Sequence, residues 1–232
     1  MESYLNQNEF DLSKVNFSSI MSTVYLWMCI GLGVTGLTAW YTYTSEWLFL
    51  AIFSNTATFY GLVIVELVLV LAFRAILNKA NYVVALSCFL VYSIVNGLTL
   101  AAVFLWYTGV SIASTFFITA ATFLAMSIYG YTTKKDLSGW RSYLFMGLIG
   151  IIIASIVNIF LKSDMFSFIV ALIGIVIFVG LTAYDTQKIK ERLYTATSES
   201  DINKIAIYGA LILYLDFVNL FLKLLRVLGR RK

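Results

Sequence analysis

Hydrophobic residues gather in seven runs, each about 20 residues long, which is the length a helix needs to cross a hydrocarbon core of about 30 Å. Spanning helices are therefore expected over 21–41, 57–77, 82–105, 110–130, 142–161, 165–185 and 205–228. A β-barrel would instead show short segments of alternating hydrophobicity, and the sequence has none. The pattern predicts an all-α polytopic membrane protein.

The runs divide the chain into two parts. Residues 1–20 form a polar leader, and residues 21–232 form a single domain of seven transmembrane helices. Most connections are short, so consecutive helices should be antiparallel neighbours. After the leader, 185–204 is the only long hydrophilic segment, and it is expected to be a loop.

The composition indicates that the partner of this chain is the lipid bilayer. The chain is 61% hydrophobic and 12% charged, whereas soluble domains carry about 25% charged residues. The net charge of +4 does not indicate a nucleic-acid partner, because the basic residues lie between the apolar runs. The chain has no histidine, which removes imidazole catalysis and most transition-metal sites. We therefore expect no enzymatic activity and no bound cofactor.

The distribution of lysine and arginine predicts the orientation. With the N-terminus inside, the first three outer loops carry only Lys162. The inner segments carry ten basic residues: Lys14, Arg74, Lys79, Lys134, Lys135, Arg141, Lys188, Lys190, Arg192 and Lys204. The positive-inside rule then favours a cytoplasmic N-terminus. Seven spans would place the basic tail Gly229–Lys232 outside, so either the tail is tolerated there or the last helix crosses only in part. We favour full crossing.

The last run carries an acidic residue, Asp216, near its middle. A carboxylate at that depth costs about 3 kcal/mol on insertion scales. At about 100° per residue, several polar side chains share one sector of this helix, about 80° wide. They are Asp216, Asn219, Lys223 and Arg226. This polar stripe should face protein or water, so we expect the last helix to be central.

Other polar residues within spans are candidates for function or for helix contacts. Glu66 and Arg74 lie about 12 Å apart along the second span, too far to pair directly. Either could belong to an ion path, and structural ion pairing with another helix is the alternative. Arg74 could also extend to the inner interface. Asn96, Asn158 and Asn219 are expected to form hydrogen bonds between helices.

Asp185, at the end of the sixth run, is the natural partner for Asp216. Gly174 shares its helix face, which allows close approach of another helix. The two carboxylates meet only if the sixth span dips into the membrane or the seventh starts late. If they meet, they cannot both ionise cheaply and would share a proton, which would hold the two helices together. Deprotonation would make them repel each other and attract a hard cation such as Ca²⁺, bound transiently. This would be a pH-dependent latch on a cation path.

Two intramembrane aspartates also occur in intramembrane aspartyl proteases. In those enzymes a Tyr-Asp pair faces a Gly-x-Gly-Asp motif. Tyr184 and Asp185 fit the Tyr-Asp pair. Asp216, however, follows Leu213, Tyr214 and Leu215 rather than a glycine-rich segment, and the chain has no proline. An aspartyl protease is therefore the weakest alternative.

Three stretches carry a family resemblance: GLTAYDTQKIK (180–190), GALILYLDFVNLFLKLLRVLG (209–229) and YGYTTKKDLSGW (129–140). They resemble the Bax inhibitor-1 family, also called the transmembrane Bax inhibitor motif family, and most closely its bacterial inner-membrane branch. The resemblance implies seven helices with the last surrounded by the other six. It also implies a pH-sensitive calcium leak channel gated by an aspartate pair, which Asp185 and Asp216 match in place.

The same resemblance leaves a second function open. The polar residues of the family's second span would correspond to Glu66 and Arg74. Eukaryotic relatives modulate cell death and stored calcium, whereas some bacterial relatives interact with a membrane protease. The alternative is therefore a non-transporting regulatory protein of the stress or cell-death modulator type, which binds a membrane protease or a translocation component. In neither case is a cofactor implied, and Ca²⁺ would be the permeant ion.

Overall fold

The computed structural model describes residues 17–76, 82–196 and 198–232, which contain helices and no β-strand. Seven helical spans in these ranges are long and apolar enough to cross a membrane, which confirms the predicted fold class. The long helices are α1 (Phe17–Thr44), α3 (Thr56–Ile76), α4 (Tyr82–Leu100), α6 (Gly109–Thr132), α7 (Arg141–Leu161), α8 (Asp164–Tyr194) and α9 (Glu199–Leu228). Shorter helices are α2 (Glu46–Phe53), α5 (Val103–Trp106) and the 3₁₀ helix η2 (Ser138–Trp140). The leader up to residue 16 lies outside the described residues, and so does Lys79.

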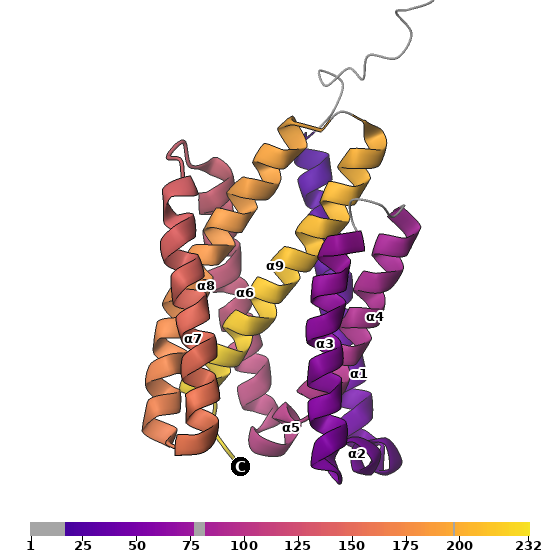
Figure 1. Cartoon of the computed structure of the whole chain (residues 1–232), viewed down its shortest axis with the longest axis vertical. Coiled ribbons are helices and arrows are strands. Elements are labelled where there is room, and N and C mark those ends of the chain that lie inside the picture. Colours follow the sequence, from indigo (N-terminus) through magenta and orange to yellow (C-terminus); the bar gives the residue numbers. More distant parts are fainter. Residues whose placement is uncertain (1–16, 77–81, 197) are drawn as a thin grey trace, which may run out of the picture.

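Helix α9 is the most buried of the spanning helices. It crosses the bundle diagonally, with α6, α7 and α8 on one side and α1, α3 and α4 on the other (Figure 1). In its most apolar window 67% of the residues are buried, against at most 39% in the other spans. Its main neighbours are α8, α1, α6 and α4, whereas α3 packs chiefly on α4 and α7 on α8. All six other spanning helices are expected to surround α9. In the structure, four of them pack closely against it.

The segment 185–204 is not the loop expected from its polarity. Helix α8 continues to Tyr194, and α9 begins at Glu199. The reason is an amphipathic pattern, since Ile189 and Leu193, one helical turn apart, are both buried while polar residues occupy the other face. Asp185 consequently lies about 13 Å inside the end of α8 rather than at its end.

Close helix crossings lock α8 in place. At Gly130 of α6, an added Cβ would collide with the backbone carbonyl of Ala183 in α8. Two residues after Ala183, Asp185 points from the same helix toward α9. The loop between α6 and η2 is also tied to α8, because the Gln187 side chain accepts from Leu137 N (2.8 Å) and donates to Lys135 O (2.9 Å). In that loop the pKa of Asp136 lies below its ordinary value, because Ser138 donates hydrogen bonds to its carboxylate.

The basic tail lies at the end of the bundle opposite to the turn between α8 and α9 (Figure 1). Thr108 N donates to Arg230 O (3.2 Å), and Lys232 N donates to Trp106 O (3.0 Å). Arg231 pairs with Asp164 at 3.1 Å, which raises the pKa of its guanidinium. Helix α9 therefore runs the full length of the bundle, as expected if it crosses completely, and the charged groups of Arg231 and Lys232 have partners.

We predict that Gly130→Ala destabilises the protein, because the added methyl group forces α6 and α8 apart. The free energy of unfolding should fall by roughly 1–3 kcal/mol, the usual range for overpacking. Gly150→Ala is the matched control, since an added Cβ there meets no atom within 4 Å. Thermal unfolding in detergent checks both variants. Equal midpoints for Gly130→Ala and Gly150→Ala would contradict the tight crossing.

Candidate functional site

The carboxyl groups of Asp185 and Asp216 meet between α8 and α9. They are close enough to interact both through a hydrogen bond and through their charges. The register of the two antiparallel helices explains this contact. Ile189 lies against Gly209 on one side of the pair, and Gly174 lies against Lys223 on the other. Because α8 does not end at Asp185, neither a dip of α8 nor a late start of α9 is needed.

Asp216 is closed off from the surface, and Asp185 is partly buried. Asp216 is only 6% exposed, and its Oδ2 atom is buried without a hydrogen-bond partner. Next to Asp185 in sequence, the Thr186 hydroxyl lies 3.3 Å from the Ser127 hydroxyl of α6. The Tyr25 hydroxyl of α1 meets both of these groups. Hydroxyl groups of α1, α6 and α8 therefore meet one residue along the chain from Asp185.

Neither aspartate has a basic partner among the side chains that the structure describes. Arg192 interacts with Asp185 only through its charge, and its guanidinium lies 5.0 Å from the centre of the Tyr208 ring. The side chain of Arg74 lies outside the described residues, whereas its backbone belongs to α3. In the described part of the chain, no group of three or more acidic or thiol side chains could hold a metal ion.

The polar stripe of α9 faces α8 along its length. Besides the aspartate contact, the stem of Lys223 packs over Gly174. One turn further along, Arg226 donates to Asp164 at 2.7 Å. Asn219 departs from the prediction, because its amide donates to Leu215 O of its own helix (2.8 Å) rather than to another helix.

Glu66 belongs to a separate polar network on the other side of α9. Its carboxylate accepts from Thr99 Oγ1 at 2.5 Å and from Asn96 Nδ2 at 3.1 Å. Asn96 in turn accepts from the Tyr214 hydroxyl at 2.9 Å, and that hydroxyl lies 2.6 Å from Thr35 Oγ1. The chain of contacts joins α3, α4, α9 and α1. Sequence reasoning anticipated the interhelical bond of Asn96 but missed Tyr214, Thr35 and Thr99.

The two polar sites share one helix but face opposite ways. Tyr214 and Asp216 are two residues apart, which corresponds to about 200° around α9. Tyr214 therefore points toward α1 and α4 while Asp216 points toward α8. The structure does not bring Glu66 to the aspartate pair. The sequence does contain one signal for this network, which is a tyrosine two residues from Asp216 within the apolar run. A tyrosine hydroxyl buried in a protein usually finds a hydrogen-bond partner.

Comparison with known proteins agrees with these features. Residues 18–232 match the family described as "Inhibitor of apoptosis-promoting Bax1". The chain is 48% identical over 222 residues to inner membrane protein YbhL of Escherichia coli (strain K12), covering 94% of each chain. It is 44% identical over 216 residues to a Borreliella burgdorferi protein, covering 93% of each. It is also 40% identical over 223 residues to a membrane protein of Streptococcus pyogenes serotype M1, covering 94% of this chain and 95% of that one.

These matches extend over nearly the whole of the helical bundle, including α8 and α9 with their paired aspartates. The chain therefore belongs to the Bax inhibitor-1 family of membrane proteins.

Proposed function

We propose that the protein is a pH-sensitive leak channel for cations, with Ca²⁺ as the permeant ion. The observation that carries the proposal is the contact between Asp185 and Asp216, buried at the α8–α9 interface with one carboxylate oxygen unpartnered. In a membrane interior, acidic residues are rare and are typical of ion and proton pathways. In this proposal the N-terminus faces the cytoplasm, and the protein catalyses no reaction.

The protonation state of the two carboxyl groups determines whether the pair holds α8 and α9 together. When the two carboxyl groups share a proton, a hydrogen bond holds α8 against α9 and the path is closed. When that proton leaves, two negative charges repel each other in a medium of low dielectric constant, and the helices separate. The closed state thus holds one more proton than the open state, so a rise in pH favours opening. The titration belongs to the pair as a unit.

The same carboxylates give the path its preference for cations. Oxygen ligands suit hard cations, and Ca²⁺ takes about six to eight of them in a resident site. Two side chains supply fewer oxygens, which suits a passing ion rather than a bound cofactor. Glu66 is a further acidic group for the path, and it would have to exchange its bonds to Asn96 and Thr99 for an ion.

We predict that purified protein in liposomes passes Ca²⁺ faster at pH 8 than at pH 5. Asp185→Asn and Asp216→Asn should both remove this pH dependence and keep flux low, because an amide beside a carboxyl group leaves no pair of like charges. A fluorescent calcium indicator inside the liposomes measures the flux. Glu46→Gln, which removes an exposed acidic group on α2, is the control and should behave like wild type.

Two outcomes would contradict the channel. Flux indistinguishable from empty liposomes at every pH would favour the regulatory alternative, which needs no transport. A pH dependence that persists in both asparagine variants would show that another group senses the proton.

We also predict that water reaches the stripe side of α9 at high pH. In a background without Cys29 and Cys88, Asn219→Cys should react with a charged, membrane-impermeant thiol reagent faster at pH 8 than at pH 6. Phe221→Cys, about 200° around the helix from Asn219, should remain unreactive. Equal reaction rates at the two positions would argue against a path along this face.

A further inference from the structure

A third polar feature lies away from the aspartate pair and from the Glu66 network, near the end of the bundle that holds the tail. It is a pocket of about 300 Å³ between α7, α8 and α9. Its polar lining consists of Ser155, Asn158, Ser167, Lys223 and Arg226, and the rest is Val170, Ala171 and Leu222. The ionisable side chains of the lining are both basic. The pocket is therefore suited to an anion.

Lys223 is the unpaired charge of this pocket. Its stem packs over Gly174, and its side chain is partly buried. Among the described residues no hydrogen bond or ion pair involves Lys223, so desolvation is not offset by a partner. A basic group held away from water without a counter-ion is expensive, and such groups in membrane proteins usually have a partner.

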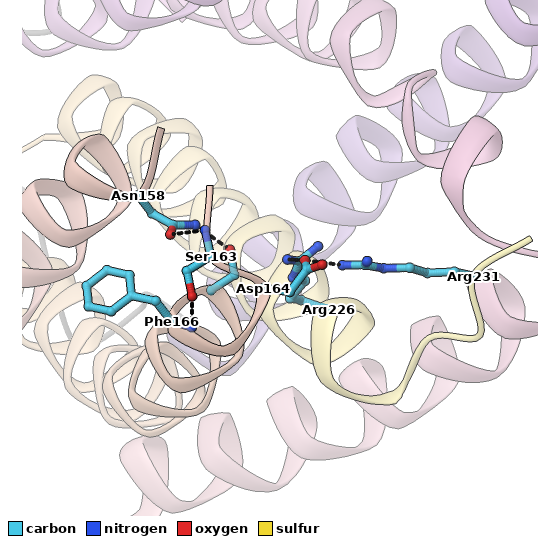
Figure 2. Close-up of polar contacts among 7 residues, drawn as sticks. Asn158, Ser163, Asp164, Phe166, Arg226 and Arg231 are labelled. Carbon is cyan, nitrogen blue, oxygen red and sulfur yellow. Dashed lines mark hydrogen bonds and ion pairs between the residues drawn. The ribbon is translucent and has the colours of Figure 1, made fainter. Parts of the chain in front are cut away.

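Asp164, the acid that pairs with Arg226 of the pocket lining, is not a partner of Lys223. Figure 2 shows Asp164 between Arg226 and Arg231, with both guanidinium groups directed at the same carboxylate. Those distances are 2.7 Å to Arg226 and 3.1 Å to Arg231. Asp164 thus carries two basic partners already and is not part of the pocket lining. The pocket lining therefore contains no acidic side chain that could balance the charge of Lys223.

Neutral donors complete the lining. Asn158 Nδ2 donates to Ser167 Oγ at 2.6 Å, and Asn158 Oδ1 accepts from Ser163 N at 3.2 Å (Figure 2). These bonds hold the amide and hydroxyl groups at fixed positions beside the basic side chains. An ammonium, a guanidinium and hydroxyl donors around one cavity are the groups that recognise phosphate.

We propose that this pocket binds a phosphate group, with Lys223 as the principal ligand. The group could belong to the head of an anionic phospholipid or to free phosphate. The lipid source fits the position, because Ile159 of α7 and Phe168 of α8, each next in sequence to a lining residue, carry exposed apolar side chains. Acyl chains could lie against these side chains while the head group reaches Lys223. The site is independent of the aspartate latch and stands whether or not the protein transports ions.

Thermal unfolding of the full-length protein in maltoside micelles tests the proposal, because these micelles contain no phosphate. One arm adds dioctanoyl phosphatidylglycerol, a second adds dioctanoylglycerol, which has no phosphate, and a third adds inorganic phosphate against chloride at equal ionic strength. A ligand that binds only the folded state raises the unfolding midpoint by mass action. We expect phosphatidylglycerol to raise it by at least about 3 °C at saturation. We expect dioctanoylglycerol to have no such effect.

Matched variants distinguish binding in the pocket from non-specific attraction of anions to basic side chains. Lys223→Met should lose the shift, whereas Lys162→Met, an exposed lysine at the same end of the bundle, should keep it. If Lys223→Met does not fold, Ser155→Leu serves instead, because it fills the pocket from an exposed position. A Lys223-dependent shift with inorganic phosphate alone identifies free phosphate as the source. The proposal is overturned if no phosphate-bearing compound raises the midpoint, or if the pocket variants retain the full shift.

Discussion

The contact between two acidic side chains inside an apolar bundle is the constraint on which the rest of the structure depends. Asp216 is buried and lacks a described counter-ion, so its environment must be supplied by neighbouring helices. That requirement explains why α9 lies in the interior of the bundle, why α8 is pressed against it, and why α6 crosses α8 closely at Gly130 beside the pair. Acidic side chains without a counter-ion are rare inside membranes and typically mark functional sites.

Polar contacts on opposite faces fix how α9 is turned. Asp216 meets Asp185 on the α8 side, and Tyr214 joins the network of Asn96, Thr35 and Glu66 on the other. Apolar side chains alone would leave the rotation of a helix weakly defined in a membrane, because lipid is as apolar as leucine. Hydrogen bonds from two directions define it. Movement at the aspartate pair would therefore act between α8 and a unit made of α9, α1 and α4.

Much of the architecture was predictable from the sequence, because the bilayer sets both the length and the composition of the spans. The seven helices and the protein-facing stripe of α9 follow from hydrophobic runs and from the 3.6-residue period. The extension of α8 was mistaken for a loop, because its many charged residues hide the buried pair Ile189 and Leu193. The partners of Tyr214 could not be predicted, since they depend on which helices lie beside α9. The pocket at Lys223 was missed for the same reason, as its lining comes from three helices.

In the proposed latch, Asp185 and Asp216 share a proton that keeps α8 on α9. Infrared spectroscopy of the reconstituted protein tests it directly, because a protonated carboxyl group has its own carbonyl band, separate from that of a carboxylate. Subtracting the spectrum of Asp216→Asn removes the contribution of Glu66 and the surface acids. A shared proton predicts a difference band of a protonated carboxyl group at neutral pH that disappears as the pH is raised. A difference spectrum that shows only ionised carboxylates at neutral pH would contradict it.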